Sequence, residues 1–84
     1  MAQAEVFEKV VSILKPFVKS QEALAKVAME TTILGELKVN SARLVDVVLE
    51  IEDAFDIEVT DTEADKVSTV GDAVNLVMKK AKAA

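Results

Sequence analysis

Several of the side chains that commonly take part in catalysis or metal binding are missing from this sequence. The chain of 84 residues contains no His and no Cys, so it lacks the usual neutral-pH general base and the commonest transition-metal ligand. A zinc–thiolate site, a disulfide and a Cys nucleophile are excluded as well. Because Trp and Tyr are also absent, an active site would have to consist of carboxylates, lysines and hydroxyls. We therefore expect that the protein is not an enzyme.

Acidic residues are concentrated in the middle of the chain. Residues 36–65 contain ten acidic and two basic residues, a net charge of −8, whereas residues 1–35 are neutral and residues 66–84 carry +3. Clustered carboxylates repel nucleic-acid phosphates and anionic membranes and attract basic protein surfaces. We therefore expect protein partners with basic patches and no nucleic acid. A solvated face without a partner is the alternative.

The acidic segment does not have the spacing of a calcium loop. An EF-hand loop that began at Asp56 would need Gly at its sixth position and Glu at its twelfth. The sequence has Asp61 and Val67 at these positions. Gly35 and Gly71 are isolated, so there is no glycine-rich phosphate loop. We expect no metal site.

Asn40 and Ser41 stand at the start of the most regular helical pattern of the chain. From chemistry alone, the favoured interpretation is that one of them caps the helix. A hydroxyl at this place is also exposed, and a phosphate attached to it would lie against free N–H groups and the positive end of the helix dipole. Ser41 is therefore a candidate for a tethered phosphodiester, although the pattern alone does not prefer this to capping.

Amphipathic helices must supply the scaffold for these residues. The pattern of residues 3–15 predicts a helix that Pro16 ends or kinks. Its apolar positions are Val6, Phe7, Val10, Val11, Ile13 and Leu14. Thr69 is expected to cap a last helix, with Asp72 in its first turn and Lys79, Lys80 and Lys82 at its end, as the helix dipole favours. Its apolar positions are Val70, Ala73, Val74 and Val77.

The clearest pattern spans residues 41–55, which we examine at an advance of about 100° per residue. One stripe is predicted to be core and consists of Leu44, Val47, Val48, Ile51 and Phe55. The opposite stripe is acidic and consists of Asp46, Glu50 and Asp53. Val45 and Leu49 lie between the two stripes. An exposed aliphatic pair rimmed by acids is typical of a small docking surface, and we favour docking over accidental exposure.

The connecting segments are less regular. Residues 17–39 include a short helical turn that begins at Ser20 or Gln21. Residues 31–35 are expected to form a loop with buried aliphatic anchors. Residues 56–61 are predicted to form an extended loop, and residues 62–65 a short helix capped by Thr60 or Asp61.

These elements predict an all-α protein, a small four-helix bundle with three main helices and one short helix. The chain has no apolar run of 18 residues, so we expect no stable membrane insertion. The absence of Cys agrees with a cytoplasmic location. Nothing in the sequence demands more than a monomer.

Two segments give the chain a resemblance to the acyl carrier protein family over nearly its whole length. Residues 41–59, SARLVDVVLEIEDAFDIEV, look like the family's modified serine followed by its acidic recognition helix and a loop of the FDIEI type. Residues 66–74, KVSTVGDAV, are similar to the family's KITTVGDAV entry into its last helix. Residues 32–34 fall where the loop before the serine carries hydrophobic anchors. Two separated motifs at matching spacing make the resemblance specific.

The resemblance implies one carrier domain over residues 1–84, with no catalysis of its own. A phosphopantetheinyl transferase (holo-carrier synthase) would attach 4′-phosphopantetheine from coenzyme A to Ser41 Oγ, which makes the protein a phosphoprotein. The thiol of this arm would hold an acyl group as a thioester and pass it between enzymes of fatty-acid, lipid or related biosynthesis. Acyl-transferring or synthase enzymes with basic patches would contact Asn40, Val45, Asp46, Leu49, Glu52 and Asp53. The core residues that would part to shelter the acyl chain are Val47, Ile51, Phe55 and Val74.

The residues around Ser41 depart from the family pattern. The family has Asp-Ser-Leu, usually with Gly two residues before the Asp, where this chain has Lys38-Val39-Asn40-Ser41-Ala42. Arg43 is a base where the family commonly has an acid, and it can pair with Asp46. These differences indicate a specialised carrier rather than the general fatty-acid one. An aminoacyl or polyketide-unit carrier and an unmodified acidic helical interaction module remain alternatives.

Overall fold

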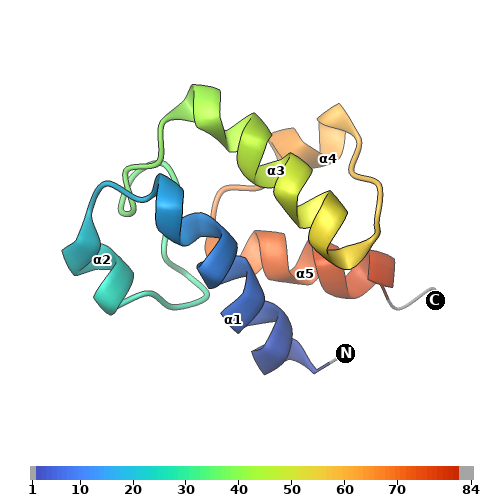
Figure 1. Ribbon diagram of the computed structural model, residues 1–84, viewed down its shortest axis with the longest axis horizontal. Coiled ribbons are helices and arrows are strands. Elements are labelled where there is room, and N and C mark those ends of the chain that lie inside the picture. The colour runs from blue at the N-terminus through green and yellow to red at the C-terminus, as the bar shows by residue number, and fades with distance from the viewer. Residues whose placement is uncertain (1, 82–84) are drawn as a thin grey trace.

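The computed structural model describes residues 2–81 and shows a small helical bundle (Figure 1). The long helices are α1 (Gln3–Leu14), α3 (Ser41–Phe55) and α5 (Val70–Ala81). The short ones are α2 (Gln21–Ala25), α4 (Asp61–Asp65) and a 3-10 turn, η1 (Lys15–Phe17), which contains Pro16. The predicted all-α fold is confirmed, and residues 2–81 contain no strand. None of the helices described there is long and apolar enough to span a bilayer.

Two short α-helices are present where the sequence predicted one. The helical turn expected near residue 20 is a separate helix, α2, because Ser20 caps it: the Ala23 N–H donates to Ser20 Oγ at 3.3 Å. The predicted short helix is α4, and Thr60 is its cap. The Glu63 N–H donates to Thr60 Oγ1 at 3.2 Å, and the Thr60 N–H donates back to Glu63 Oε1 at 3.0 Å.

The core lies where the apolar faces of the three long helices meet. α1 packs most extensively against α5 and also contacts α3. Most predicted core positions are confirmed, since the buried hydrophobic residues of the long helices are Val6, Val10, Leu14, Val47, Ile51, Phe55, Val70, Ala73, Val74 and Val77. The stripe predicted on α3 is too wide, however. Leu44 and Val48 are only half-buried, because the side of α3 on which they lie borders an open groove.

The loop between α2 and α3 is fixed by backbone pairing with the segment before α5. Ile33 N–H donates to Ser68 O, and Val70 N–H donates to Thr31 O, both at 2.9 Å. Thr32 and Thr69 form an isolated antiparallel bridge. Ile33 is a buried anchor as predicted, but Leu34 is 44% exposed. Leu34 lies in a turn that the N–H groups of Glu36 and Leu37 close by donating to Thr32 O, and its side chain faces the serine groove described below. The other buried anchors are Leu37 and Val39.

Thr69 caps α5, as predicted. The Asp72 N–H donates to Thr69 Oγ1 at 3.0 Å, while the Asp72 carboxylate accepts the N–H groups of Ser68 and Thr69. These two backbone hydrogen bonds hold the pKa of Asp72 below its ordinary value. Lys79 and Lys80 lie in the last turn of α5. The third predicted lysine, Lys82, lies outside the described residues.

Lys38, just before α3, has a left-handed backbone with φ 57°. A Cβ atom makes this conformation unfavourable by about 1–2 kcal/mol, whereas glycine adopts it freely. We expect Lys38→Gly to raise the free energy of unfolding by up to about 1 kcal/mol, because greater freedom of the unfolded glycine offsets part of the gain. Urea unfolding would measure the change.

Lys26→Gly is a matched control, because Lys26 is also exposed but has φ −110°. Glycine relieves no strain there, so this variant should lose about 0.5–1 kcal/mol. Equal losses in the two variants would contradict the strain assigned to Lys38.

Candidate functional site

Ser41 is the first residue of α3 and is exposed. Asn40 is the cap of this helix, since the Ala42 N–H donates to Asn40 Oδ1 at 2.8 Å. The capping role is therefore filled by Asn40 and not by Ser41. Within the described residues the Ser41 hydroxyl has no hydrogen-bond partner. It is thus a nucleophilic oxygen on the surface that the fold does not use.

The first turn of α3 offers fewer free N–H groups than the sequence suggested. Arg43 and Leu44 N–H groups both donate to Asn40 O, at 2.8 and 3.2 Å, in addition to the Ala42 bond. Three of the first four helix N–H groups are therefore already satisfied. A phosphate on Ser41 would gain mainly from the helix dipole, because the Arg43 guanidinium pairs with Asp46 at 3.2 Å.

An open groove, which we call the serine groove, begins at Ser41 and runs between α3 and α4. Its volume is about 630 Å³, within the range of small-molecule sites in proteins. α3 contributes Ser41, Leu44, Val45, Val48, Leu49 and Glu52. α4 and the loops contribute, among others, Leu34, Val59, Asp61, Ala64, Asp65 and Val67. The floor is mainly aliphatic, and the charged residues that line the groove are acidic.

The predicted aliphatic docking pair is exposed, as expected from the helical wheel. Val45 is 63% and Leu49 56% exposed, and both line the serine groove. Of the predicted acids, Asp46 pairs with Arg43 at 3.2 Å, whereas Asp53 is exposed and forms no ion pair with another residue of the described range 2–81.

Glu52 has a structural task that the sequence did not reveal. Its carboxylate accepts the Val59 N–H at 3.1 Å, and its side chain is half-buried. It therefore fixes the loop between α3 and α4, which forms one wall of the serine groove.

α4, the opposite wall, is held against α5 by an ion pair. Lys80 Nζ lies 2.7 Å from Glu63 Oε1, and both side chains are about three-quarters buried. The hydrogen bond from Lys80, together with that from the Thr60 N–H, lowers the pKa of Glu63 from its ordinary value of 4.5 to about 2. α4 is thus tied to α5 through Glu63.

The depressed pKa of Glu63 predicts a pH-dependent contribution to stability. The contribution is fully present above about pH 4.5, where the unfolded carboxyl is also ionised, and is lost as the pH falls towards about 2. We expect the wild type to unfold at a higher urea concentration than Glu63→Gln at pH 6, with a difference that shrinks towards pH 2. A difference independent of pH would contradict the assignment.

The core itself contains little free space. A gap of about 10 Å³ between α1, α3 and α5 is lined by Val47, Ile51 and neighbouring aliphatic residues, and this is close to the smallest volume that holds one water molecule. Phe55 and Val74 are buried in the same core. An acyl chain could enter there only if the helices separated, whereas the serine groove is already open.

The sequence did not identify the walls of the serine groove. Leu34, Val59 and Val67 come from loops, and the only signal for each was an apolar residue in an otherwise polar segment.

Among residues 2–81, no three or more acidic residues come close enough together to hold a metal ion.

A protein-family model described as "Phosphopantetheine attachment site" matches residues 9–77. This span includes all of α3, the loop before it and most of α5. Members of this family carry a covalently attached 4′-phosphopantetheine. The geometry fits such a group, because the exposed Ser41 lines an open and mainly aliphatic groove of about 630 Å³, which can border a flexible arm.

Proposed function

The chain belongs to the phosphopantetheine-attachment family, and from that premise we propose that it is an acyl carrier protein with its arm on Ser41. The observation that carries the proposal is the position of this serine. It is the first residue of α3, exposed and unpartnered in the described structure, and it opens onto the serine groove.

Ser41 Oγ would act as the nucleophile during loading. It attacks the phosphorus of coenzyme A that bears pantetheine, so that an Oγ–P bond forms, the phosphoanhydride bond breaks and adenosine 3′,5′-bisphosphate leaves. The hydroxyl proton must pass to a base of the transferase, because the chain contains no His and the neighbouring Asn40 Oδ1 already accepts the Ala42 N–H. This division of labour agrees with a carrier that is not an enzyme.

The arm supplies a terminal thiol that holds an acyl group as a thioester, a function that this Cys-free chain cannot provide by itself. The residues of the serine groove would border the arm, with Leu44, Val45 and Leu49 offering apolar contact. An acyl chain too long for the groove would need the core to open between Val47 and Ile51. We propose enzymes of fatty-acid, lipid or related biosynthesis as the users of this cargo.

Partner enzymes would approach the exposed face of α3 beside Ser41. A basic patch on the transferase or synthase suits the acids of this face, Asp46 and Asp53 among them, and Val45 and Leu49 would add apolar contact. The partner enzyme would also contact Asn40, which precedes the reacting Ser41. We propose that the carrier acts as a monomer in the cytoplasm. A chain without Cys forms no disulfide, which agrees with this reducing compartment.

An intact-mass spectrum tests the proposal directly. The protein is incubated with coenzyme A, Mg²⁺ and a broad-specificity phosphopantetheinyl transferase. We expect a mass increase of one arm, mapped by peptide fragmentation to Ser41. Folded protein that gains no mass with this enzyme or with transferases from its own host would contradict the proposal.

One observation favours a second function, an unmodified interaction module. The ion pair between Arg43 and Asp46 partly neutralises the acidic face directly beside Ser41, which would hinder a transferase that docks on acids. This hypothesis predicts partner binding that persists without an arm but weakens when Asp46 and Asp53 are reversed to Lys. A requirement of the arm for binding would exclude it.

A further inference from the structure

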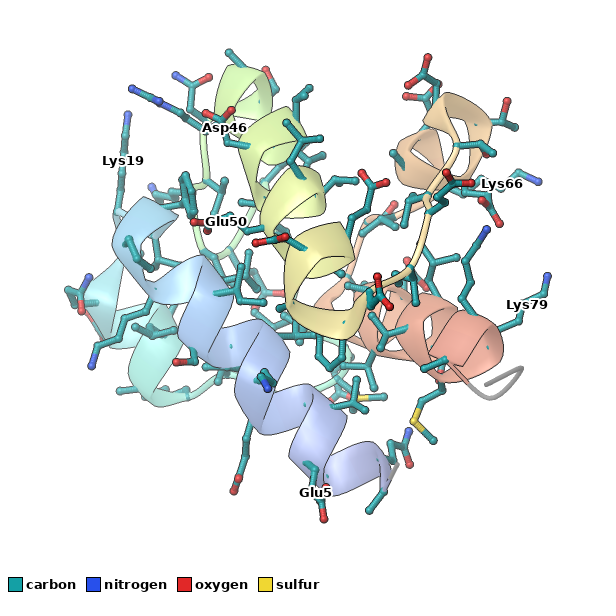
Figure 2. The ribbon with its side chains drawn as sticks, turned by 45° about the vertical axis from the view of Figure 1, so that its right-hand side comes forward. Glu5, Lys19, Asp46, Glu50, Lys66 and Lys79 are labelled. Carbon is teal, nitrogen blue, oxygen red and sulfur yellow. The ribbon has the colours of Figure 1, made fainter. Side chains whose placement is uncertain are left out.

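Two lysines from separate segments lie close to the start of α3. Lys38 stands three residues before Ser41, and Lys19 follows the 3-10 turn η1. The two segments are joined by their backbones, since the N–H groups of Lys19 and Ser20 donate to Leu37 O at 3.2 and 3.3 Å. Figure 2 shows the Lys19 side chain pointing towards the end of the molecule at which α3 begins. We call Lys19 and Lys38 the lysine patch.

The lysine patch is not neutralised by the protein itself. Lys19 and Lys38 are exposed, and no carboxylate oxygen of residues 2–81 lies within 4.0 Å of either ammonium group. The neighbouring Glu36 carboxylate already accepts a backbone N–H of its own loop at 3.1 Å. Arg43 is the other base in this region, and its charge is paired with Asp46. The two lysines are therefore the cations that a partner can reach here.

The charge of the chain changes sign at the start of α3. Residues 15–43 contain five basic and three acidic residues, a net charge of +2, whereas residues 44–65 contain nine acidic residues and no basic one. Figure 2 shows Lys19 on the opposite side of the molecule from Lys66 and Lys79. A protein that approaches the attachment serine thus meets positive side chains on the loop before α3 and negative side chains along the helix.

The backbone of Lys38 indicates that its side chain has a task. The φ of 57° is left-handed, which is unfavourable for a residue with a Cβ atom. Residues held in such conformations are concentrated at functional sites. The exposed Lys38 side chain forms no ion pair with residues 2–81, so the fold gains nothing from its charge. Glycine would remove the strain, but it would remove the charge as well.

We propose that the lysine patch is a specificity contact, and that its occupant is an acidic surface segment of the phosphopantetheinyl transferase that loads this carrier. The carboxylates of that segment pair with Lys19 and Lys38, while basic residues of the same enzyme meet the acids of α3. Charge complementarity selects this occupant, because a transferase with only basic residues around its active site is repelled by two lysines near Ser41. The inference rests on the proposed attachment at Ser41 and adds that the transferase presents charges of both signs.

Loading kinetics test the lysine patch on the full chain. The assay uses the transferase of the protein's own host that loads the wild type fastest, at about 0.15 M salt to limit long-range attraction. Lys19→Gln combined with Lys38→Gln should lower kcat/KM about three- to ten-fold, through a higher KM with kcat unchanged. Glutamine keeps a Cβ atom at position 38, so the backbone strain stays the same.

A matched double variant controls for net charge. Lys66→Gln combined with Lys79→Gln removes two exposed charges on the other side of the molecule. General attraction between an acidic carrier and a basic enzyme predicts an equal or lower KM for both double variants, because each makes the carrier more negative. We expect this result for the control only. An equal or lower KM for Lys19→Gln with Lys38→Gln would overturn the proposal.

Single variants of Lys38 separate its charge from its backbone conformation. Lys38→Arg keeps the charge and should load like the wild type. Lys38→Gly should load as slowly as Lys38→Gln, although it relieves the strain. Loading of Lys38→Gly at the rate of the wild type would show that the charge is not read, and would overturn the proposal.

Binding in the absence of coenzyme A identifies the occupant. Titration calorimetry should show that Lys19→Gln with Lys38→Gln binds the transferase more weakly than the wild type, because the contact is between the two proteins. Slower loading without weaker binding would place the phosphates of coenzyme A on the lysines and overturn the proposal. The premise is tested separately: if a broad-specificity transferase adds no arm to Ser41 of the wild type, the proposed function fails first.

Discussion

Replacing Ser41 with alanine is expected to abolish attachment of the phosphopantetheine arm completely, while the protein stays folded. The hydroxyl oxygen is the only heavy atom that the variant loses. Among the described residues this oxygen makes no hydrogen bond, so its removal should not destabilise the fold. Asn40 still caps α3 through the Ala42 N–H. Intact-mass spectrometry after incubation with coenzyme A and transferase would show no gain, and far-ultraviolet circular dichroism would be unchanged.

Ser68→Ala is the matched control for this experiment. Ser68 is also exposed and lines the serine groove, but it precedes α5 and lies far from the first turn of α3 in the sequence. This variant should gain one arm like the wild type. An arm on Ser41→Ala, or its loss from Ser68→Ala, would show that the attachment site lies elsewhere.

Gly71→Ala is expected to cause the largest loss of stability among single methyl additions. Gly71 is buried at the start of α5, and its N–H donates to Met29 O at 2.7 Å. A Cβ atom at this position would lie 2.7 Å from the same backbone oxygen, so the loop or the helix must shift. We expect a loss of about 2–3 kcal/mol, a large part of the ~4–12 kcal/mol that is typical for a chain of this size.

Gly35→Ala is the control for Gly71→Ala, and urea unfolding measures both. At Gly35 an added Cβ would meet the Thr32 side chain, with Oγ1 at 2.9 Å and Cβ at 3.8 Å, and a side chain can move more readily than backbone. The loss there should stay within about 1 kcal/mol. Comparable losses in the two variants would contradict the idea that the close approach of Met29 restricts position 71.

Much of the fold was predictable because it depends on neighbouring residues. The apolar spacing of Val6, Val10 and Leu14 marks one helix face, and the same local rule identified the buried side of α5. Caps such as Thr60 and Thr69 act within three residues of themselves. The exposure of Val45 and Leu49 followed from the same wheel. Ser41, by contrast, was singled out over capping only by the family resemblance, because a serine at a helix start has an ordinary structural explanation.

The sequence alone thus determined the three long helices, most of the core and the charged character of α3, since each is set by residues within a few positions of one another. Only the tertiary structure decided where the serine groove opens, because its walls bring Leu34, Val59 and Val67 together with α3. It also made Glu52 a loop anchor and joined Glu63 to Lys80. These contacts depend on how distant segments pack, and local spacing carries no information about the distance between them.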